Sequence, residues 1–209
     1  KNISIFSFEP IRNIYDVLRK NSILSNNKNF KVYHRGISHE NGVQEFNYFP
    51  NSPALSSINN EIVESDGYLI TALEGSLSNP PKNWWWAHLI PKFLYPYIIK
   101  QLLKGSIKVE CEIKTLSNQI ESFSIDKIDL LKIDCEGNEL NVIDGIDSTH
   151  WSIIKQLVIE VNDIDGRLDY IKKKLTDLGY KYKIIKEDAL KNTDLVNILE
   201  SFPNDIKKL

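Results

Sequence analysis

The stretch Leu130-Leu131-Lys132-Ile133-Asp134-Cys135-Glu136-Gly137-Asn138-Glu139 decides the fold class of this 209-residue chain. An apolar run that begins at Ile128 leads into it, and the stretch ends in clustered charge. Such a run is typical of a central strand of a parallel sheet, which is buried on both faces. Asp134 and Glu136 follow at the carboxyl end of this strand, which is where open α/β sheets bind their ligands.

A second apolar run, from Ile153 to Val161, is the next predicted strand and also ends in polar side chains, namely Glu160, Asn162 and Asp163. If the two strands are neighbours, Asp134, Glu136, Glu160 and Asn162 converge on one site. Desolvation there raises the pKa of a carboxyl group toward the range of a general base. We therefore interpret these four residues as candidate catalytic residues.

Two alternatives remain open for these charges. Asp134 followed by acidic residues is also the pattern of a helix N-cap and first turn. Oxygen ligands at strand ends can also hold a hard cation, but carboxylate pairs are common there without one, so we assign no metal site. Lys132 lies inside the predicted strand, where a buried ammonium group requires a partner.

Strands and helices alternate along most of the rest of the chain. Further strands are predicted at residues 3–8, 30–37, 43–49, 107–113, 180–185 and 195–199, and helices at 10–23, 115–120, 140–146 and 168–178. This alternation predicts an α/β fold with a doubly wound parallel sheet. At the end of the first strand lies Phe8-Glu9-Pro10. A carboxylate in that place accepts hydrogen bonds from both hydroxyls of a ribose, or it favours the dipole of the next helix.

Residues 50–105 interrupt the alternation, with repeated prolines and an aromatic cluster at Trp84, Trp85 and Trp86. We interpret them as a lid or substrate subdomain inserted into a single domain that spans residues 1–209, with Trp86 and His88 facing the substrate. The alternatives are that the rings cover the insertion's own core or lie on a membrane surface. We expect no membrane contact, and proline and charge break the stretch too often for it to span a bilayer.

Composition narrows the function classes. The 26 basic and 28 acidic side chains give a net charge of −2. We expect no nucleic-acid partner, because no cationic field is available for phosphates. The two cysteines cannot form a disulfide framework or a zinc motif, which favours the cytoplasm. The chain contains no Met and starts directly in a strand-like run, so we expect a piece of a longer polypeptide.

Five motifs, in order along the chain, resemble the FkbM family of S-adenosylmethionine-dependent O-methyltransferases, in particular the branch embedded in nonribosomal peptide and polyketide synthases. They are Phe8-Glu9-Pro10 with the helix around Tyr15 to Asn21, Tyr48-Phe49-Pro50-Asn51, Cys111 to Ile120, Ile128 to Glu139, and Ile159 to Leu168. The resemblance implies a Rossmann-like methyltransferase sheet and methyl transfer to a hydroxyl of a small-molecule or carrier-tethered acceptor. It also implies a place in a multidomain synthase.

The resemblance also assigns site residues. It implies that Glu9 and Pro10 bind the ribose of S-adenosylmethionine. Residues around Gly36, Ile37 and Ser38 are expected near the adenine, and Lys132 is also expected to contact the cofactor. Asp134 and Glu136 would border the methyl-transfer site.

Two features depart from the family pattern. The first strand and its glycine-rich turn, Asp-x-Gly-Ala-Asn-x-Gly, do not occur in residues 1–209, and Asn162 stands where synthase-embedded relatives usually carry His. An amide is not a base at neutral pH, so the base would be Glu160, Asp134 or Glu136. The alternative is a non-catalytic, degenerate methyltransferase domain that serves as an interaction module.

Overall fold

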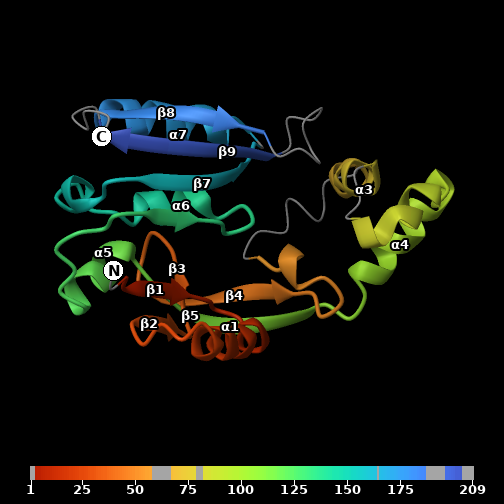
Figure 1. Cartoon of the computed structure of the whole chain (residues 1–209), viewed down its shortest axis with the longest axis horizontal. Coiled ribbons are helices and arrows are strands. Elements are labelled where there is room, and N and C mark those ends of the chain that lie inside the picture. Colours follow the sequence, from red (N-terminus) through yellow and green to blue (C-terminus); the bar gives the residue numbers. More distant parts are fainter. Residues whose placement is uncertain (1–2, 58–66, 79–81, 164, 187–195, 204–209) are drawn as a thin grey trace.

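The computed structural model describes residues 3–57, 67–78, 82–163, 165–186 and 196–203, and it shows a mixed α/β fold (Figure 1). The strands form three hydrogen-bonded groups, in the orders β1-β2, β3-β5-β4 and β6-β7-β9-β8. Parallel pairs occur in each group, as the alternation of strands and helices predicts.

The first group is a parallel pair with a crossover helix. β1 (Ile5–Phe8) and β2 (Phe30–Tyr33) are joined by α1 (Arg12–Leu24). Pro10, just before α1, suits a helix start, and the left-handed φ of 56° at Asn26 marks its end. The Tyr33 ring stacks on that of Phe123, with 4.5 Å between centroids, which joins this pair to α5 (Leu116–Ser122).

The second group carries the chain from β2 toward the insertion. β3 (Gly36–Ile37) runs parallel to β5 (Ile107–Lys114), and β4 (Gly42–Tyr48) pairs with β5 in antiparallel fashion. The strand expected at residues 30–37 is thus two strands in two different groups. A tight turn separates them, in which the Arg35 N–H donates to the Tyr33 carbonyl at 3.0 Å.

The third group contains the two strands that carry the candidate carboxylates. β6 (Leu131–Ile133) runs parallel to β7 (Leu157–Asn162), and α6 (Glu139–Asp144) and the short η4 (His150–Ile153) lie between them in the chain. α7 (Arg167–Asp177) leads to β8 (Tyr180–Ile185), and β9 (Val196–Pro203) lies between β7 and β8. β9 is antiparallel to both neighbours, and β4 is antiparallel to β5, so the predicted parallel sheet is in fact a mixed one.

The main core lies between this third group and its helices. Its fully buried members come from β6, β7, α6, α7 and the segment before β7, and include Ile133, Ile143, Ile154, Leu157, Ile159, Ile171 and Leu175. Alternate residues of β7 are buried completely, which fixes the register of that strand. The core therefore holds the carboxyl ends of β6 and β7 in place.

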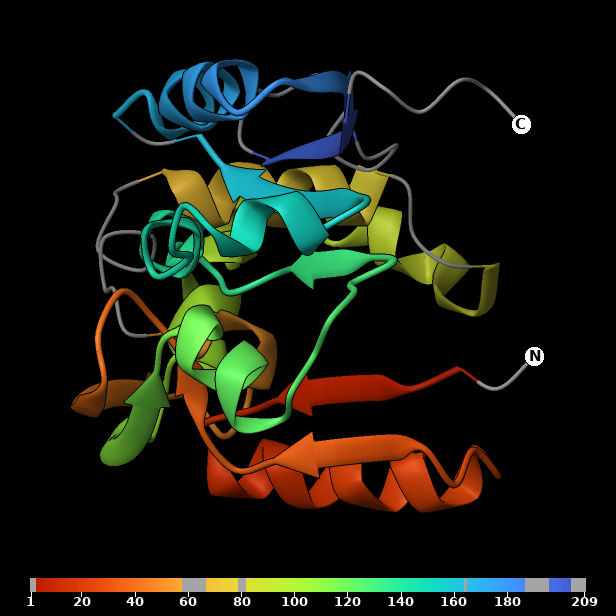
Figure 2. The ribbon, with the colours of Figure 1, turned by 90° about the vertical axis from the view of Figure 1, so that its left-hand side faces the viewer.

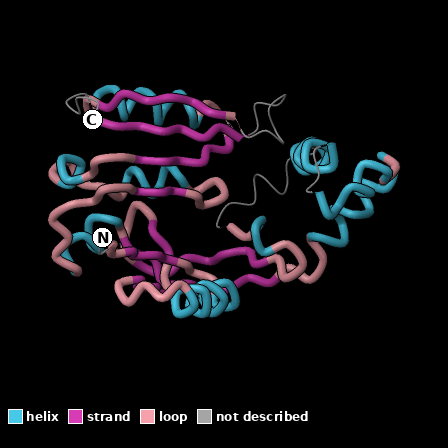
Figure 3. The backbone as a smooth tube through the Cα atoms, in the orientation of Figure 1, coloured by secondary structure: helices cyan, strands magenta, loops and turns pink. Residues whose placement is uncertain are grey.

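β1, β2, β6 and β7 point in the same direction, so their carboxyl ends lie at one end of the molecule (Figure 2). β1 pairs only with β2, and β6 only with β7, among the described residues. Each of these two strands consequently has one edge without a described strand partner. The arrangement of helices, strands and loops around them can be followed in Figure 3.

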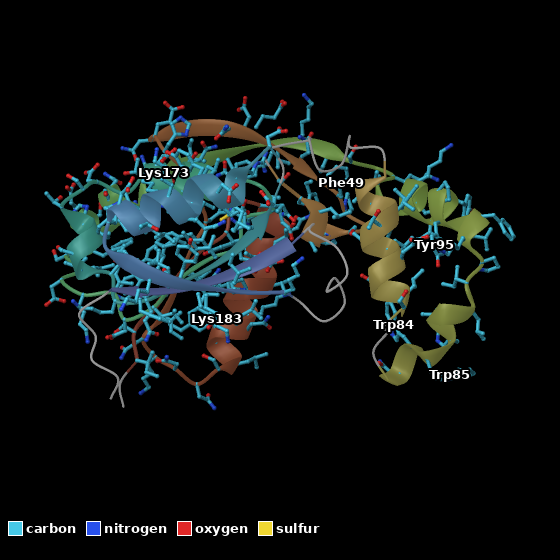
Figure 4. The ribbon with its side chains drawn as sticks, turned by 90° about the horizontal axis from the view of Figure 1, so that it is seen from above. Phe49, Trp84, Trp85, Tyr95, Lys173 and Lys183 are labelled. Carbon is cyan, nitrogen blue, oxygen red and sulfur yellow. The ribbon has the colours of Figure 1, made fainter. Side chains whose placement is uncertain are left out.

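The described part of residues 50–105, which we predict to be an insertion, is mostly helical and has a small core of its own. It contains η1 (Pro53–Leu55), α3 (Tyr68–Ser78), η2 (Lys82–Leu89), η3 (Lys92–Leu94) and α4 (Tyr95–Leu102). Leu77, Ala87 and Tyr95 pack together, while Trp84 and Trp85 lie at the far end of the insertion, away from the sheet (Figure 4). None of the described helices has both the length and the apolar character that crossing a membrane requires.

Candidate functional site

The polar ends of β6 and β7 form the candidate site. The register pairs Lys132 with Val158 and Ile133 with Ile159, so the residues that follow β6 lie beside the last residues of β7. Asp134 and Glu160 both act electrostatically on Glu136, and the side chain of Asn162 is hydrogen-bonded to it. The structure thus brings together the four candidate catalytic residues that the sequence analysis names.

Glu136 is the group most changed by this environment. Burial raises the pKa of its carboxyl group to about 7, and the negative charges of Asp134, Glu160 and Glu139 add to the effect, whereas the hydrogen bond from Asn162 opposes it. A carboxyl group with a pKa near neutrality can exchange a proton at physiological pH. Glu136 is therefore the candidate general base among the four.

Lys132 differs from its expected environment. Its side chain is exposed and its ammonium group lies 2.7 Å from Asp134 Oδ2. The hydrogen bond to Asp134 raises the pKa of Lys132. The expectation of a buried ammonium group is wrong, because successive side chains of β6 point to opposite faces of the sheet, and the face opposite the buried Ile133 leaves Lys132 exposed in the described structure.

Glu9 lies at the carboxyl end of β1 and is half-buried. Its Oε1 accepts a hydrogen bond of 2.8 Å from the N–H of Ile11, the residue just before α1. One of its two oxygens is therefore bound to the backbone at the start of the helix. Burial raises the pKa of the Glu9 carboxyl group. The neighbouring Pro10 packs on Gly36, where an added Cβ would lie 3.4 Å from Pro10 Cβ. Glu9, Pro10 and Gly36 are therefore close neighbours.

The loop after β3 connects these residues to the carboxylates. The Asn138 side-chain amide donates to the Ile37 carbonyl at 3.3 Å, and Asn138 is two residues from Glu136. Ser38 is fully buried, and its N–H donates to the Lys114 carbonyl at 2.9 Å. The residues predicted to bind a nucleoside and those predicted to move a proton thus belong to one continuous region.

Of the two residues expected to face the substrate, only Trp86 has a described side chain, and it lies apart from this region. Trp86 is about half exposed and its ring stacks on Trp84, with 6.3 Å between centroids. Among the described residues, no hydrogen bond or ring contact connects Trp86 to the four candidate catalytic residues. The side chain of His88 lies outside the described part of the structure.

Cys135 stands between Asp134 and Glu136 but is not suited to nucleophilic chemistry. Its side chain packs against the main core, and burial raises the pKa of its thiol to about 12. A thiol with that pKa carries almost no thiolate at neutral pH. Cys135 therefore acts as a small hydrophobic residue of the core.

A possible metal-ligand group lies elsewhere. Glu121, Asp147 and His150 place one potential ligand atom each within 4.8 Å of one another. They come from α5 and the segment between α6 and η4, and both carboxylates are exposed. Exposed groups of this kind are common without a metal, and none of the three belongs to the candidate site.

The sequence analysis did not identify two buried charged residues beside the site, Glu139 and Arg167. Glu139 Oε1 accepts a hydrogen bond of 2.8 Å from the Gly137 N–H, and Arg167 Nη1 donates to the Gly137 carbonyl at 3.1 Å. In the sequence, Glu139 reads as an ordinary acidic residue of a first helical turn. No local pattern indicates that Arg167, 30 residues after Gly137, donates to the Gly137 carbonyl.

Comparison with known proteins places the chain in a family. The model of the family described as "Methyltransferase FkbM domain" matches residues 2–182. No solved structure is significantly similar to the chain.

The curated relatives are longer than the segment that matches this chain. Methyltransferase sdnD of Sordaria araneosa is 29% identical over 185 residues, which cover 84% of this chain and 64% of that protein. The 31-O-demethyl-FK506 methyltransferase FkbM of Streptomyces tacrolimicus is 25% identical, with 90% of this chain and 67% of that protein covered. The AMB antimetabolite synthetase AmbE of Pseudomonas aeruginosa is 26% identical over 92% of this chain but only 9% of its own length. The chain spans less than two thirds of the length of sdnD, and it belongs to the FkbM methyltransferase family.

Proposed function

We propose that this chain catalyses methyl transfer from S-adenosylmethionine to a hydroxyl oxygen of a small-molecule or carrier-bound natural product. Family membership supports methyl transfer. The observation that carries the proposal is the meeting of Glu136 with Asn162, Asp134 and Glu160 at the carboxyl ends of two parallel strands. Burial there, together with the two neighbouring carboxylates, raises the pKa of Glu136 to about 7.

In this proposal Glu136 removes the hydroxyl proton. Bound S-adenosylmethionine supplies a methyl group on a positively charged sulfur. The ionised Glu136 carboxylate accepts the proton as the acceptor oxygen forms its bond to the methyl carbon, and the carbon–sulfur bond breaks with its electron pair left on sulfur. Asn162 holds the carboxylate by a hydrogen bond, and because an amide has no basic lone pair at neutral pH it does not take the proton itself.

The residues at β1 and β3 fit the nucleoside half of the cofactor. A half-buried carboxylate at the end of a parallel strand suits a ribose diol, because each hydroxyl can donate to it. Only one oxygen of Glu9 is used in the helix-start bond to Ile11. Pro10 and the small Gly36 flank it. In this proposal Gly36, Ile37 and Ser38 provide backbone close to the adenine. Lys132, on β6, contacts the cofactor as well.

We further propose that one more parallel strand lies between β1 and β6 in the complete protein. The support is that these two strands point the same way and each has one edge without a described strand partner (Figure 2). A glycine-rich turn after that strand would hold the methionine half of the cofactor, at a helix N-terminus as in other nucleotide-binding sheets.

The acceptor class is proposed from the relatives and the insertion. One relative is named as a 31-O-demethyl-FK506 methyltransferase and another as an antimetabolite synthetase, which supports an acceptor from natural-product synthesis. We assign residues 50–105 the role of a lid over the acceptor, with Trp86 and His88 on its substrate side. Aromatic lids exclude water from transfer reactions.

Calorimetric titration of the full-length gene product with S-adenosylhomocysteine tests the proposal. The informative variant is Glu9→Gln, because its amide oxygen still accepts from the Ile11 N–H while the second acceptor oxygen is lost. The matched control is Glu45→Gln, which changes an exposed carboxylate paired with Lys108. We expect binding by the wild-type and control proteins and at least ~10-fold weaker binding by Glu9→Gln. No binding by the wild-type protein would instead favour the non-catalytic interaction module.

A further inference from the structure

The two peptide groups that flank Gly137 are each held by a charged side chain. The Gly137 N–H, in the Glu136–Gly137 peptide group, donates to Glu139 Oε1 at 2.8 Å. The Gly137 carbonyl, in the Gly137–Asn138 peptide group, accepts from Arg167 Nη1 at 3.1 Å. Glu139 is the first residue of α6 and Arg167 the first residue of α7, so the backbone of Gly137 ties the loop after β6 to two helices that are far apart in the sequence.

Both charged side chains are buried. Glu139 is 1% exposed and Arg167 is 9% exposed. The charge of Arg167 favours ionised Glu139, although burial of Glu139 raises its pKa overall. Removing one member of a buried pair of opposite charges leaves the other without compensation, which costs far more than removing an exposed charge. Glu139 and Arg167 are thus buried side chains that cannot be replaced singly without a large cost in stability.

The loop they hold has an unusual backbone. Glu136 has a φ of 47° and Gly137 a φ of 97°, two consecutive residues in the left-handed region. For a residue with a side chain, this region costs roughly 1 kcal/mol and persists where the surrounding structure imposes it. Glu136, in this left-handed part of the loop after β6, has its side chain hydrogen-bonded to Asn162 of β7.

We propose that Arg167 and Glu139 are positioning residues for Glu136: by holding the two peptide groups that flank Gly137, they keep the Glu136 carboxylate against Asn162 at the site of proton removal. This inference rests on the proposed function, since it assigns the pair a role in methyl transfer. Neither residue is assigned a contact with cofactor or acceptor.

A merely structural role would lower stability and leave the titration of Glu136 unchanged. The charged groups that face Glu136 are Asp134 at the end of β6, Glu139 on α6 and Glu160 on β7, and Lys132 is paired with Asp134. If Arg167 is lost and the loop relaxes, Glu136 moves away from Asn162 and from these carboxylates toward solvent. Burial is the largest cause of the raised pKa, so regained hydration outweighs the lost hydrogen bond from Asn162 and Glu136 becomes easier to ionise. A purely electrostatic loss of the Arg167 charge predicts the opposite, because removing a nearby positive charge makes a carboxyl group harder to ionise.

The test is a carbon-13 NMR pH titration of the Glu136 carboxyl group in the full-length protein, with its signal assigned by Glu136→Gln. We expect a midpoint near 7 in the wild type. In Arg167→Met it should fall by about one unit or more, and Arg167→Lys should restore part of that change. The matched control Lys173→Met removes an exposed charge from the same helix and should leave the midpoint unchanged (Figure 4).

A midpoint in Arg167→Met that is unchanged or higher would overturn the proposal. If Arg167→Met does not fold, the double variant Glu139→Gln/Arg167→Met, which has no unpaired buried charge, is compared with Glu139→Gln alone. The double variant should have the lower midpoint, and equal midpoints would also overturn the proposal.

The titration needs neither cofactor nor acceptor, so it separates this inference from the proposed function. Absence of S-adenosylhomocysteine binding by the wild type would contradict the proposed function whatever the titration shows. A wild type that binds S-adenosylhomocysteine, with the same Glu136 midpoint in Arg167→Met, would contradict only the positioning role.

Discussion

Glu136 and Asn162 are joined by a side-chain hydrogen bond that spans the carboxyl ends of β6 and β7. Glu136 supplies a carboxylate that can take a proton, and Asn162, which is buried, supplies an amide that cannot. Asn162 therefore orients and stabilises the ionised form of its neighbour.

Asn162→Ala is expected to raise the pKa of Glu136 above about 7, because it removes the hydrogen bond that stabilises the carboxylate. The change should be of the order of one unit and is measured by carbon-13 NMR of the Glu136 carboxyl group. The control is Asn51→Ala, which changes an amide that bonds to the carbonyls of Gln101 and Lys104. A lower or unaltered Glu136 pKa in Asn162→Ala would show that this hydrogen bond does not control the carboxylate.

Methyl transfer should follow the ionisation of Glu136. The rate at low acceptor concentration is expected to rise with pH and to level off above about 7. Glu136→Gln should lower the rate by roughly 100-fold or more while leaving the affinity for S-adenosylhomocysteine nearly unchanged. Transfer of a labelled methyl group by the full-length protein measures the rate, and calorimetry measures the affinity for S-adenosylhomocysteine. Full activity of Glu136→Gln would assign the proton to another residue.

The same carboxyl group should make stability depend on pH. Its pKa is 4.5 in an unfolded chain and about 7 in the folded one, so between these values the folded state binds more protons. The free energy of unfolding therefore falls as pH rises from about 4.5 to 7 and then stays level, as far as Glu136 contributes. Glu136→Gln removes this contribution, so relative to wild type it should gain roughly 2 kcal/mol at pH 8, after allowance for solvent screening, and nothing near pH 4.

Urea denaturation of both proteins at a series of pH values checks this difference. Glu45→Gln, which changes an exposed carboxylate, should follow the wild-type curve. An equal effect of Glu136→Gln at pH 4 and pH 8 would mean that the native pKa of Glu136 is not raised.

Gly145 joins the loop after β3 to the end of α6, and a side chain there should not be tolerated. A Cβ at Gly145 would lie 2.2 Å from the Ser38 carbonyl oxygen, whereas one at Gly42 would meet nothing within 4 Å. We expect Gly145→Ala to lose about 3 kcal/mol of unfolding free energy and Gly42→Ala to lose less than about 1. Urea denaturation compares the two, and equal losses would contradict the close approach of Ser38 to Gly145.

The alternation of strands and helices and the position of the polar strand ends could be read from the sequence. A buried parallel strand needs an apolar run, and its carboxyl end is the first place where charge is tolerated, so the runs before Asp134 and Glu160 predicted where these residues meet. The expected strand at Phe30 to Ile37 was wrong in extent, because a turn at Arg35 sends the chain to a different partner strand.

Other features depend on tertiary contacts that no local pattern encodes. Lys132 is in a strand, but its exposure depends on which face of β6 is covered. The antiparallel direction of β9 depends on how the chain returns after β8. Arg167 resembles an ordinary first-turn residue, and only the folded chain shows that it donates to the Gly137 carbonyl.

A crystal structure of the full-length protein with S-adenosylhomocysteine tests the central claim most directly. The account predicts the ribose hydroxyls within hydrogen-bond distance of the Glu9 carboxylate, about 2.6–3.2 Å, and the sulfur facing the space beside Glu136 and Asn162. A ligand bound elsewhere, or bound with its sulfur remote from Glu136, would contradict it.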